Sequence, residues 1–456
     1  MRRINLISFW YVIMLGFLYL SAMRNPQEPR LERKAMQVNL SFETPFLSLL
    51  QGAEETIGDA PVVAFGECSH FLQTLHEFSN DLFRYLVERK GFRVFLIEAA
   101  WATNDYLMDF IKSDKPDIEP WMSFYLNAFD SAPTRKTLLY IRDFNKHHPL
   151  DAIQIAGMQP EQPWTDYREL NAVLAKASLK LPEDIRTLIE RAVFGGRTFA
   201  HDLDVITYHG GLRRQKQRVL SPDDLQSLKA ALDRVDSLLA ENGNDIIRAT
   251  SKWTFEESKL RVLGLRFYAL FALPAGDFGL VHKNPTDAQV SQLLGDIYGA
   301  GDAFRFEIIK TQRESRFKGK KIFIWMHSWH AAKRSEAIEC SIAGQPPIGT
   351  ISVGSHLFRA YGKAYRVIHS VVADPNFFYP PGVVTVDNAF HKVFGDKPAY
   401  VDIRNLSLEQ KALPLDVFMP QLSQIDNAYG GGIVLKDQFD GIAYFPKSGL
   451  TVERKK

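Results

Sequence analysis

Short runs of β-branched, aromatic and other apolar residues recur along the chain, and each run ends in glycine or polar residues. The runs are Pro61–Gly66, Val94–Ile97, Ala152–Gly157, Lys321–Met326, Gly349–Val353, Tyr365–Val372 and Gly441–Phe445. A nearly continuous apolar run of this length is typical of a central strand that is covered on both faces. The pattern therefore predicts a sheet with helical layers on both sides.

An amphipathic stretch joins the first two of these runs. From His76 to Arg89 the apolar side chains fall on one stripe, and Gly91 follows at a position typical of a helix end. A helix between two buried strands indicates a βαβ crossover, which makes the two strands parallel. We therefore expect an α/β fold with an open, mostly parallel sheet flanked by helices.

Between about residues 162 and 312 the strand-like runs give way to long helical patterns. The clearest one starts at Ser221-Pro222-Asp223-Asp224, a strong N-terminal cap, and continues with apolar residues at spacings of three and four. We expect a large helical insertion that packs over one end of the sheet or, alternatively, forms an interface with a second copy. The insertion belongs to one α/β domain that we predict over residues 38–456.

The N-terminus carries two arginines and then an apolar run from Ile4 to Met23. About 20 apolar residues are enough to cross a bilayer as a helix. We predict a transmembrane anchor over residues 1–24 and a polar linker over residues 25–37. The basic N-terminus places the domain on the extracytoplasmic side. A poor match to a cleavage site favours an uncleaved anchor, whereas cleavage would make the protein secreted.

Composition and charge exclude several classes of protein. The 456 residues are 46% hydrophobic, and 55 Lys and Arg nearly balance 53 Asp and Glu, for a formal net charge of +2. A nucleic acid is not an expected partner, because phosphate binding needs clustered positive charge. With only Cys68 and Cys340, a disulfide framework is excluded, although one bridge between the two is possible. These features leave the oligomeric state open.

Polar residues that can perform chemistry follow several predicted strands. Glu67 and His70 follow the first strand, Glu98 ends the second, and His327 and His330 follow a later one. Ligands of open α/β sheets bind beyond the carboxyl ends of the strands, so we expect these five residues on one rim. The spacing of three within each pair puts both side chains on one face of a first helical turn.

The residue types in these pairs indicate activation of water. A carboxylate beside an imidazole holds the ring in one tautomer and raises its basicity, so Glu67 and His70 predict a general base. The pair of His327 and His330 could donate hydrogen bonds to an oxyanion, protonate a leaving group or hold a metal. The alternative role of Glu98 is an internal salt bridge with an arginine such as Arg84 or Arg142.

The two residues between Glu67 and His70 are poor nucleophiles. The carboxylate of Glu67 raises the pKa of the Cys68 thiol, and residues one or two apart do not face each other on a helix. Ser69 has the same geometric disadvantage, and the chain has no G-x-S-x-G elbow to present a serine. Direct attack by activated water is therefore the simpler prediction.

The same residues resemble the erythromycin esterase family. Gly66-Glu67-Cys68-Ser69-His70 is similar to its G-E-x-x-H motif, and a basic amphipathic helix and a strand ending in Glu98 follow. The H-x-x-H from His327 to His330, the V-G-S-H that ends at His356 and the closing F-D-G-I also fit. The resemblance spans roughly residues 48–445, with the insertion similar only in its helical character. It implies hydrolysis of an ester by water without a covalent intermediate, and in characterised members the ester is the macrolactone of a macrolide antibiotic.

The resemblance also implies site residues and reveals departures. It assigns a catalytic role to Glu67, His70, Glu98, His327 and His330, and we expect Arg84 and His356 to bind substrate, with a structural role as the alternative for His356. A basic residue of the family is replaced by Ser79, Gly301-Asp302 lacks the arginine of an R-D pair, and Ser328 stands where asparagine is common. The two missing cations argue against a macrolide and favour another ester or lactone.

Three hypotheses follow. The first is a membrane-tethered hydrolase of a small-molecule ester or lactone that needs no cofactor. The second uses His70, His327 and His330 to bind a divalent metal, zinc or manganese, for hydrolysis of an amide or phosphoester. The third is a catalytically degenerate protein of the cell envelope that binds a glycan or a lipid-linked precursor without turnover.

Overall fold

The computed structural model describes residues 40–70, 72–101, 104–118, 126–159, 163–194, 221–269, 287–338, 349–373, 386–404, 419–420 and 432–448. The predicted anchor at 1–24 and linker at 25–37 lie outside this range, as does Cys340. No helix within these described segments is both long and apolar enough to span a membrane.

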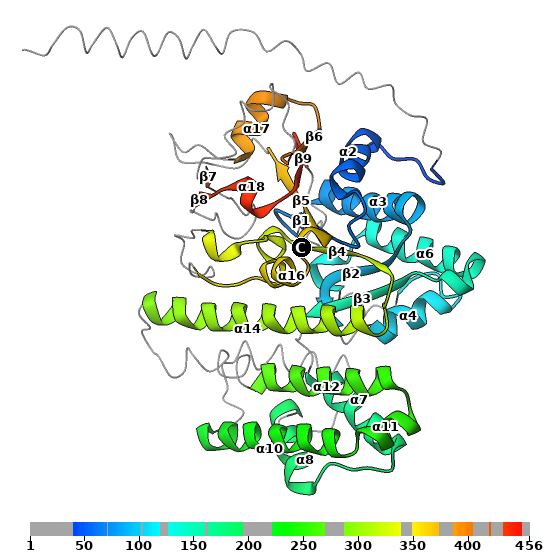
Figure 1. Ribbon diagram of the computed structural model, residues 1–456, viewed down its shortest axis with the longest axis vertical. Coiled ribbons are helices and arrows are strands. Elements are labelled where there is room, and N and C mark those ends of the chain that lie inside the picture. Colours follow the sequence, from blue (N-terminus) through cyan, green and yellow to red (C-terminus); the bar gives the residue numbers. More distant parts are fainter. Residues whose placement is uncertain are drawn as a thin grey trace, which may run out of the picture.

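The described residues form a seven-stranded sheet at the centre of the fold (Figure 1), in the order β3-β2-β4-β1-β5-β9-β6. All neighbouring strands are parallel except β6, which is antiparallel to β9. The expected α/β fold with an open, mostly parallel sheet is thus confirmed. The strands are β1 Val62–Glu67, β2 Phe92–Ala100, β3 Gln154–Gln159, β4 Lys321–His327, β5 Tyr365–Val372, β6 Ala399–Asp402 and β9 Gly441–Phe445, and β7 Met419–Pro420 pairs with β8 Gly432–Ile433 apart from them.

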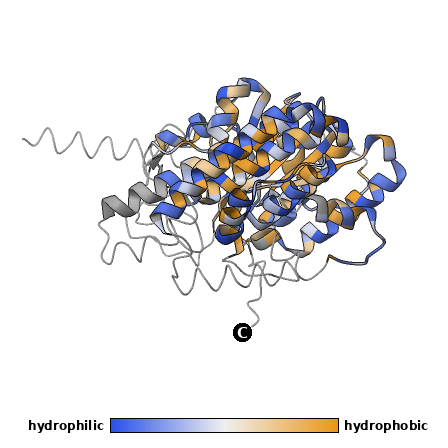
Figure 2. Cartoon of the chain, turned by 90° about the horizontal axis from the view of Figure 1, so that it is seen from below, coloured by the Kyte–Doolittle hydropathy of each residue, from blue (hydrophilic) through white to orange (hydrophobic). Residues whose placement is uncertain are grey.

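Helices cover both faces of the sheet because successive side chains of each buried strand point to opposite sides. On β1, Val63 and Phe65 belong to one apolar core, whereas Val62 and Ala64 belong to the other. The first core is covered by α2 Leu47–Ile57, α3 Gln73–Lys90, α4 Asn104–Lys112 and α6 Ala132–His147. The second is covered by α14 Asp287–Glu314, α15 Ser328–Ala331, α16 Val353–Tyr361, α17 Val386–Phe394 and α18 Leu435–Gln438. Short 3₁₀ turns occur at Asn127–Phe129, Pro149–Asp151, Ser335–Ala337 and Gly362–Ala364. Viewed from below in Figure 2, the central strands are mostly hydrophobic, while the outer helices carry both hydrophobic and hydrophilic turns.

One predicted strand was wrong. Residues from Gly349 to Ser352 do not form a strand, and α16 begins at Val353. Gly349 has a φ of +91°, which interrupts extended backbone, and the Ser352 side chain caps the helix by accepting from the N–H of Ser355. Local capping therefore outweighs the β-branched residues of this run. The sequence analysis also missed β6, a four-residue strand at the sheet edge.

The regular structure of the described residues between β3 and β4 is helical. α14 is the last of these helices, and the helices before it pack beyond α14 as a separate layer (Figure 1). They are α7 Pro163–Lys176, α8 Glu183–Phe194, α10 Pro222–Glu241, α11 Gly243–Ala249 and α12 Lys252–Phe267. The predicted cap at Ser221 is confirmed, since Ser221 and Asp224 form a reciprocal capping box at the start of α10. This layer has its own apolar core, which includes Leu170 and Leu232.

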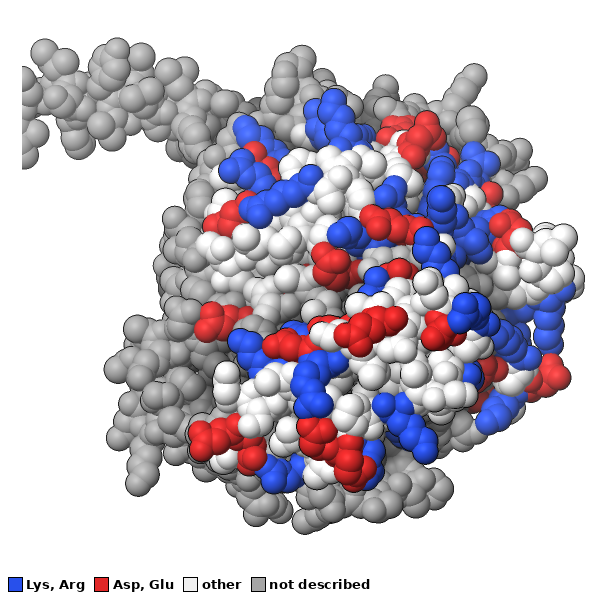
Figure 3. Space-filling view, turned by 60° about the horizontal axis from the view of Figure 1, so that its bottom comes forward, with Lys and Arg blue, Asp and Glu red and all other residues white. Residues whose placement is uncertain are grey.

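The surface of this layer carries both signs of charge. On the face that Figure 3 shows, basic and acidic side chains of the described residues are interspersed. Arg266 of α12, for example, pairs with Asp233 and Asp236 of α10. Among these residues the face shown has no continuous basic patch of the kind that holds a phosphate backbone.

Candidate active site

The sheet brings the polar ends of three neighbouring strands together. β4 lies between β1 and β2, and Glu67 is the register partner of His327. Glu98 lies near the end of β2, on the other side of β4. Because these strands are parallel, their carboxyl ends meet at one edge, as the sequence predicted.

Glu67 and His70 form a tightly held pair. Glu67 is fully buried, and its Oε1 lies 2.6 Å from Nδ1 of His70, whose side chain is 30% exposed. Oε2 of Glu67 accepts a hydrogen bond of 2.7 Å from Nε1 of Trp325. Burial lowers the pKa of His70, but the hydrogen bond and charge of Glu67 outweigh it and raise the pKa to about 9. With Nδ1 on Glu67, the imidazole presents Nε2 for chemistry.

A second histidine supports the backbone of His70. Nε2 of His76 lies 2.7 Å from the carbonyl oxygen of His70, and Nδ1 lies 2.9 Å from the hydroxyl of Ser131. The ring also packs edge-on against Trp325. Burial lowers the pKa of His76. His76 is fully buried, in the core behind His70.

Glu98 lies at the centre of a buried network. Its Oε2 accepts a 2.7 Å hydrogen bond from the backbone N–H of His327, and Oε1 lies 3.2 Å from Nε2 of His330. The Gln159 amide donates to the same oxygen over 3.3 Å. Burial raises the pKa of Glu98, but the charges of His330, His70 and Arg305 prevail and lower the pKa to about 2. Glu98 is therefore an anion across the neutral range.

His330 lies between two carboxylates. Its Nδ1 is 2.8 Å from Oδ2 of Asp302, while Nε2 faces Glu98. The same oxygen of Asp302 accepts from the backbone N–H of Val353 at the start of α16. Both ring nitrogens of His330 are thus engaged by the protein.

The site contains a cation that the sequence analysis did not find. Arg305 is buried on α14, pairs with Asp302 one turn earlier, and its Nη2 lies 3.7 Å from Oε1 of Glu98. The arginine that pairs with Glu98 is therefore neither Arg84 nor Arg142. The sequence analysis named Asp302 only as half of an incomplete pair. The spacing of three between Asp302 and Arg305 on a helix was the signal that could have identified the ion pair.

His327 differs from both other site histidines. Its Nδ1 accepts from the backbone N–H of Trp329, so the neutral ring carries its proton on Nε2. Burial, together with the charges of His70 and His330, lowers the pKa of His327 to about 3. The ring centroids of His327 and His70 are 5.4 Å apart. His327 is therefore a neutral hydrogen-bond donor beside His70.

His369 on β5 is a further buried histidine that the sequence analysis did not single out. Its Nδ1 lies 2.8 Å from the hydroxyl of Ser328, and its ring stacks on Phe439. Burial lowers the pKa of His369 to about 3, so the ring is neutral. The contact joins the turn that follows β4 to the neighbouring strand. Ser328, which stands where the family commonly has asparagine, thus has a structural partner.

Cys68 does not have the properties of a nucleophile. Burial raises the pKa of its thiol to about 12, and the nearby charge of Glu67 raises it as well. Its backbone N–H donates to the hydroxyl of Ser370 on β5. A thiol with this pKa is not ionised at neutral pH, which agrees with the prediction that water is the attacking group.

The structure places the two predicted substrate-binding residues outside the histidine cluster. The guanidinium of Arg84 lies over the rings of Phe42 and Tyr140, which gives it a packing role on α3. His356 stacks on Phe306 of α14 and is half-buried. Ser79, which replaces a basic residue of the family, is fully buried. Position 79 therefore contributes no positive charge to the site.

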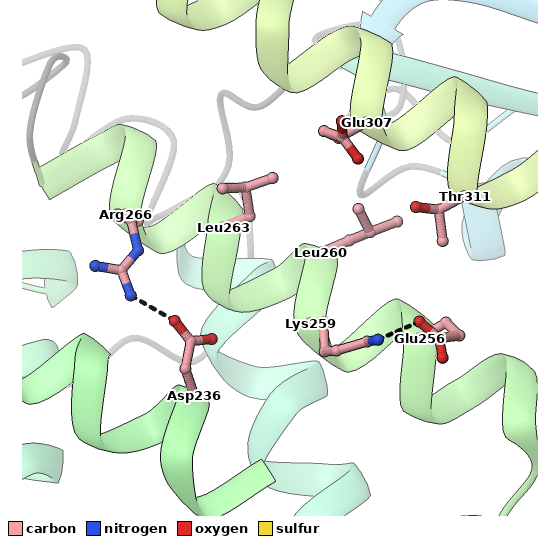
Figure 4. A pocket seen from close by; sticks show the side chains of 8 residues that line it. All are labelled: Asp236, Glu256, Lys259, Leu260, Leu263, Arg266, Glu307 and Thr311. Atoms are coloured by element: carbon pink, nitrogen blue, oxygen red, sulfur yellow. Dashed lines mark hydrogen bonds and ion pairs between the residues drawn. The ribbon is translucent and has the colours of Figure 1, made fainter. Parts of the chain in front are cut away.

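Within the described residues, no three His, Cys, Asp or Glu side chains are arranged to hold a metal ion. A cavity of about 260 Å³ lies between α10, α12 and α14 (Figure 4), and its acidic and basic residues pair with one another, as Arg266 does with Asp236 and Lys259 with Glu256. None of the clustered histidines lines this cavity.

Comparisons with known proteins relate the chain to one family. A family model described as erythromycin esterase matches residues 87–448, well over half of the chain. Erythromycin esterase type II of Escherichia coli is 31% identical over 90 residues, which are 20% of this chain and 21% of that protein. The matched range of the family model includes Glu98, His327 and His330, whereas Glu67 and His70 precede it.

Solved structures share the fold over most of the chain. A protein of Bacillus cereus has a TM-score of 0.66 at 19% identity, over 88% of this chain and 92% of that one. A succinoglycan biosynthesis protein has a TM-score of 0.63 at 18% identity, over 90% and 93%. An erythromycin esterase mutant in its open conformation has a TM-score of 0.61 at 14% identity, over 88% and 97%. At these identities the likeness shows the fold.

Proposed function

We propose, because the chain belongs to the erythromycin esterase family, that it is a hydrolase that cleaves an ester or lactone with water activated by His70. The observation that carries this proposal is the geometry of Glu67, whose two oxygens are held by Trp325 and His70. A carboxylate fixed in this way orients the imidazole and stabilises the charge that it gains with a proton.

The reaction follows from the positions of the site histidines. His70 takes a proton from water through Nε2 while the water oxygen bonds to the ester carbonyl carbon. Nε2–H of His327 donates to the oxyanion that forms. When the tetrahedral intermediate collapses, the bond to the alcohol oxygen breaks and His70 returns the proton to that oxygen. Glu98 holds the backbone N–H of His327 and so helps to fix this donor.

The contacts of His330 support a role that differs from the one expected from the sequence. Both of its ring nitrogens face carboxylates, so they are directed into the protein rather than toward a substrate. We propose that His330 maintains the arrangement of Glu98 and Asp302, and that His327 alone of the H-x-x-H pair contacts the reacting ester. No cofactor is needed for these steps.

The test of the proposed function is hydrolysis of a panel of simple esters, lactones and macrolides by the full-length chain, with and without a chelator. Turnover that is indifferent to the chelator supports the histidine mechanism. Turnover that disappears with the chelator and returns with zinc or manganese would instead support a metal-dependent hydrolase. Tight ligand binding without any turnover would favour a binding protein.

The pH dependence of kcat/KM distinguishes the role of Glu67. A general base works in its neutral form, so activity is expected to rise with pH until it passes the raised pKa of His70, about 9. Glu67→Gln removes the charge that raises this pKa, and the rising limb should move to lower pH. The control is Glu241→Gln on α10, which should leave the profile unchanged. A profile that does not move in Glu67→Gln would contradict this role of the pair.

We also propose that residues 1–24 anchor the protein and place the domain on the extracytoplasmic side. The support is the apolar run from Ile4 to Met23 after two arginines. After alkaline carbonate extraction of cells that express the full chain, the protein is expected in the membrane pellet. Its recovery in the supernatant would contradict the anchor.

A further inference from the structure

Arg305 and Gly301 lie one turn apart on the same face of α14. Residues four apart on a helix are neighbours. Arg305 is buried, and the neighbouring position, Gly301, has no side chain. A Cβ added to Gly301 would lie 4.0 Å from Nη1 of Arg305 and 3.6 Å from the ring of Phe267. A side chain at position 301 therefore points toward the space that the guanidinium occupies, and these are ordinary contact distances.

The contacts of Arg305 are with the groups that hold the site histidines. Nη1 pairs with Asp302 and lies 3.3 Å from Nδ1 of His330, and Nη2 lies 3.7 Å from Oε1 of Glu98. A planar guanidinium fixes the relative orientation of two carboxylates better than a point charge can. Those two carboxylates face the two nitrogens of His330, and Glu98 also holds the backbone of His327.

We propose that Arg305 is a positioning residue of this hydrolase, which acts through Glu98 and Asp302 on His327 at the end of β4 and on His330 of α15. This inference rests on the proposed function. The proposal also accounts for the glycine at position 301, because Arg305 supplies a guanidinium beside Asp302 from the next turn of α14. What matters for the site is that a guanidinium lies between Glu98 and Asp302, whether it comes from position 301 or from position 305.

The charge of Arg305 also reaches His70. The charged and titratable groups that face His70 come from five elements: Glu67 on β1, His76 on α3, Glu98 on β2, Arg305 on α14 and His327 on β4. The charge of Glu98 raises the pKa of His70, and that of Arg305 lowers it. Removal of the guanidinium therefore leaves excess negative charge near His70 and raises its pKa further. An arginine whose charge did not act on His70 would not produce this shift.

The decisive comparison is between Arg305→Met and the double variant Gly301→Arg/Arg305→Met in the full-length chain. Arg305→Met is expected to lower kcat by about 10²-fold, the size of effect that follows from slight misplacement of catalytic groups, with KM little changed. The double variant returns a guanidinium to the same space and should recover most of kcat. Arg313→Met is the matched control, because Arg313 lies on α14 over the ring of Tyr361 and should leave kcat unchanged.

A second readout needs no substrate. Diethyl pyrocarbonate modifies neutral imidazole, so the pH dependence of His70 modification, followed by peptide mass spectrometry, reports the pKa of His70. This pKa should rise in Arg305→Met and return toward the wild-type value in the double variant. If no ester in the panel is hydrolysed, the proposed function fails, whereas the modification experiment still tests Arg305.

Two results would overturn the proposal. One is a folded Arg305→Met protein with wild-type kcat and an unshifted His70 pKa. The other is a folded double variant that recovers neither property. If Arg305→Met does not fold, Arg305→Lys takes its place, because lysine keeps the charge but not the planar fork. A loss of kcat in Arg305→Lys that Gly301→Arg restores supports the proposal, and a loss that it does not restore contradicts it.

Discussion

Replacing His70 with alanine is expected to lower kcat/KM by about 10²- to 10⁴-fold, because a positioned general base contributes a factor of this size. His70 is the partly exposed member of the pair with Glu67, so its removal leaves the buried carboxylate in place. The measurement is initial rates on whichever ester of the panel the wild-type chain hydrolyses. His147→Ala, at an exposed position on α6, is the matched control and should keep the wild-type rate.

The same variant separates the three hypotheses. Loss of turnover in His70→Ala, together with wild-type turnover that is indifferent to a chelator, agrees with a water-activating histidine. If His70→Ala retains wild-type turnover, His70 is not the base, and the mechanism proposed here is wrong. A variant that still binds a ligand tightly while the wild-type chain never turns it over would favour the binding protein.

The pair of Glu67 and His70 also links stability to pH. The pKa of His70 in the folded chain, about 9, lies above the ordinary value of 6.5. The stabilisation from the pair is therefore fully present below pH 6.5 and is lost as the pH rises through about 9. His70→Ala should remove this dependence, so its stability should fall less than that of the wild type between these pH values.

Replacing Glu98 with alanine is expected to lower the free energy of unfolding by about 3–5 kcal/mol, the cost of removing one partner from a buried ion pair. The change leaves Arg305 and His330 with one carboxylate fewer, and it leaves the backbone N–H of His327 without its acceptor. Urea unfolding at pH 7, followed by circular dichroism, measures the effect. Glu314→Ala, at an exposed position near the end of α14, is the control and should change stability little.

The sign of the pH dependence provides an independent check on Glu98. Its pKa in the folded chain is about 2, below the ordinary value of 4.5, so its stabilising contribution is present above pH 4.5 and is lost as the pH falls through about 2. The difference in stability between wild type and Glu98→Ala should therefore narrow in acid. A difference that is small at pH 7, or that widens in acid, would show that Glu98 does not hold the buried cations.

The sequence indicated most of the sheet because the evidence for central strands is local. A buried parallel strand must be apolar on both faces, so runs such as Lys321–Met326 and Tyr365–Val372 were recognisable without any knowledge of their neighbours. The cap at Ser221 is likewise a short-range feature. The strand predicted at Gly349–Val353 was wrong because that prediction also relied on a local pattern. The β-branched residues of this run are typical of a strand, but Ser352 caps a helix. Edge strand β6 has too few apolar residues to be recognised.

What the sequence determined about the site is the set of residues at the strand ends, because the spacing of Glu67 and His70, and of His327 and His330, is fixed by the local chain. Only the tertiary structure showed which of these residues contact one another. Asp302 and Arg305 come from α14, at the end of the predicted insertion, and both lie against Nδ1 of His330. Hydrogen bonds and charges act through space, so the roles within the cluster depend on contacts between segments that are far apart in the sequence.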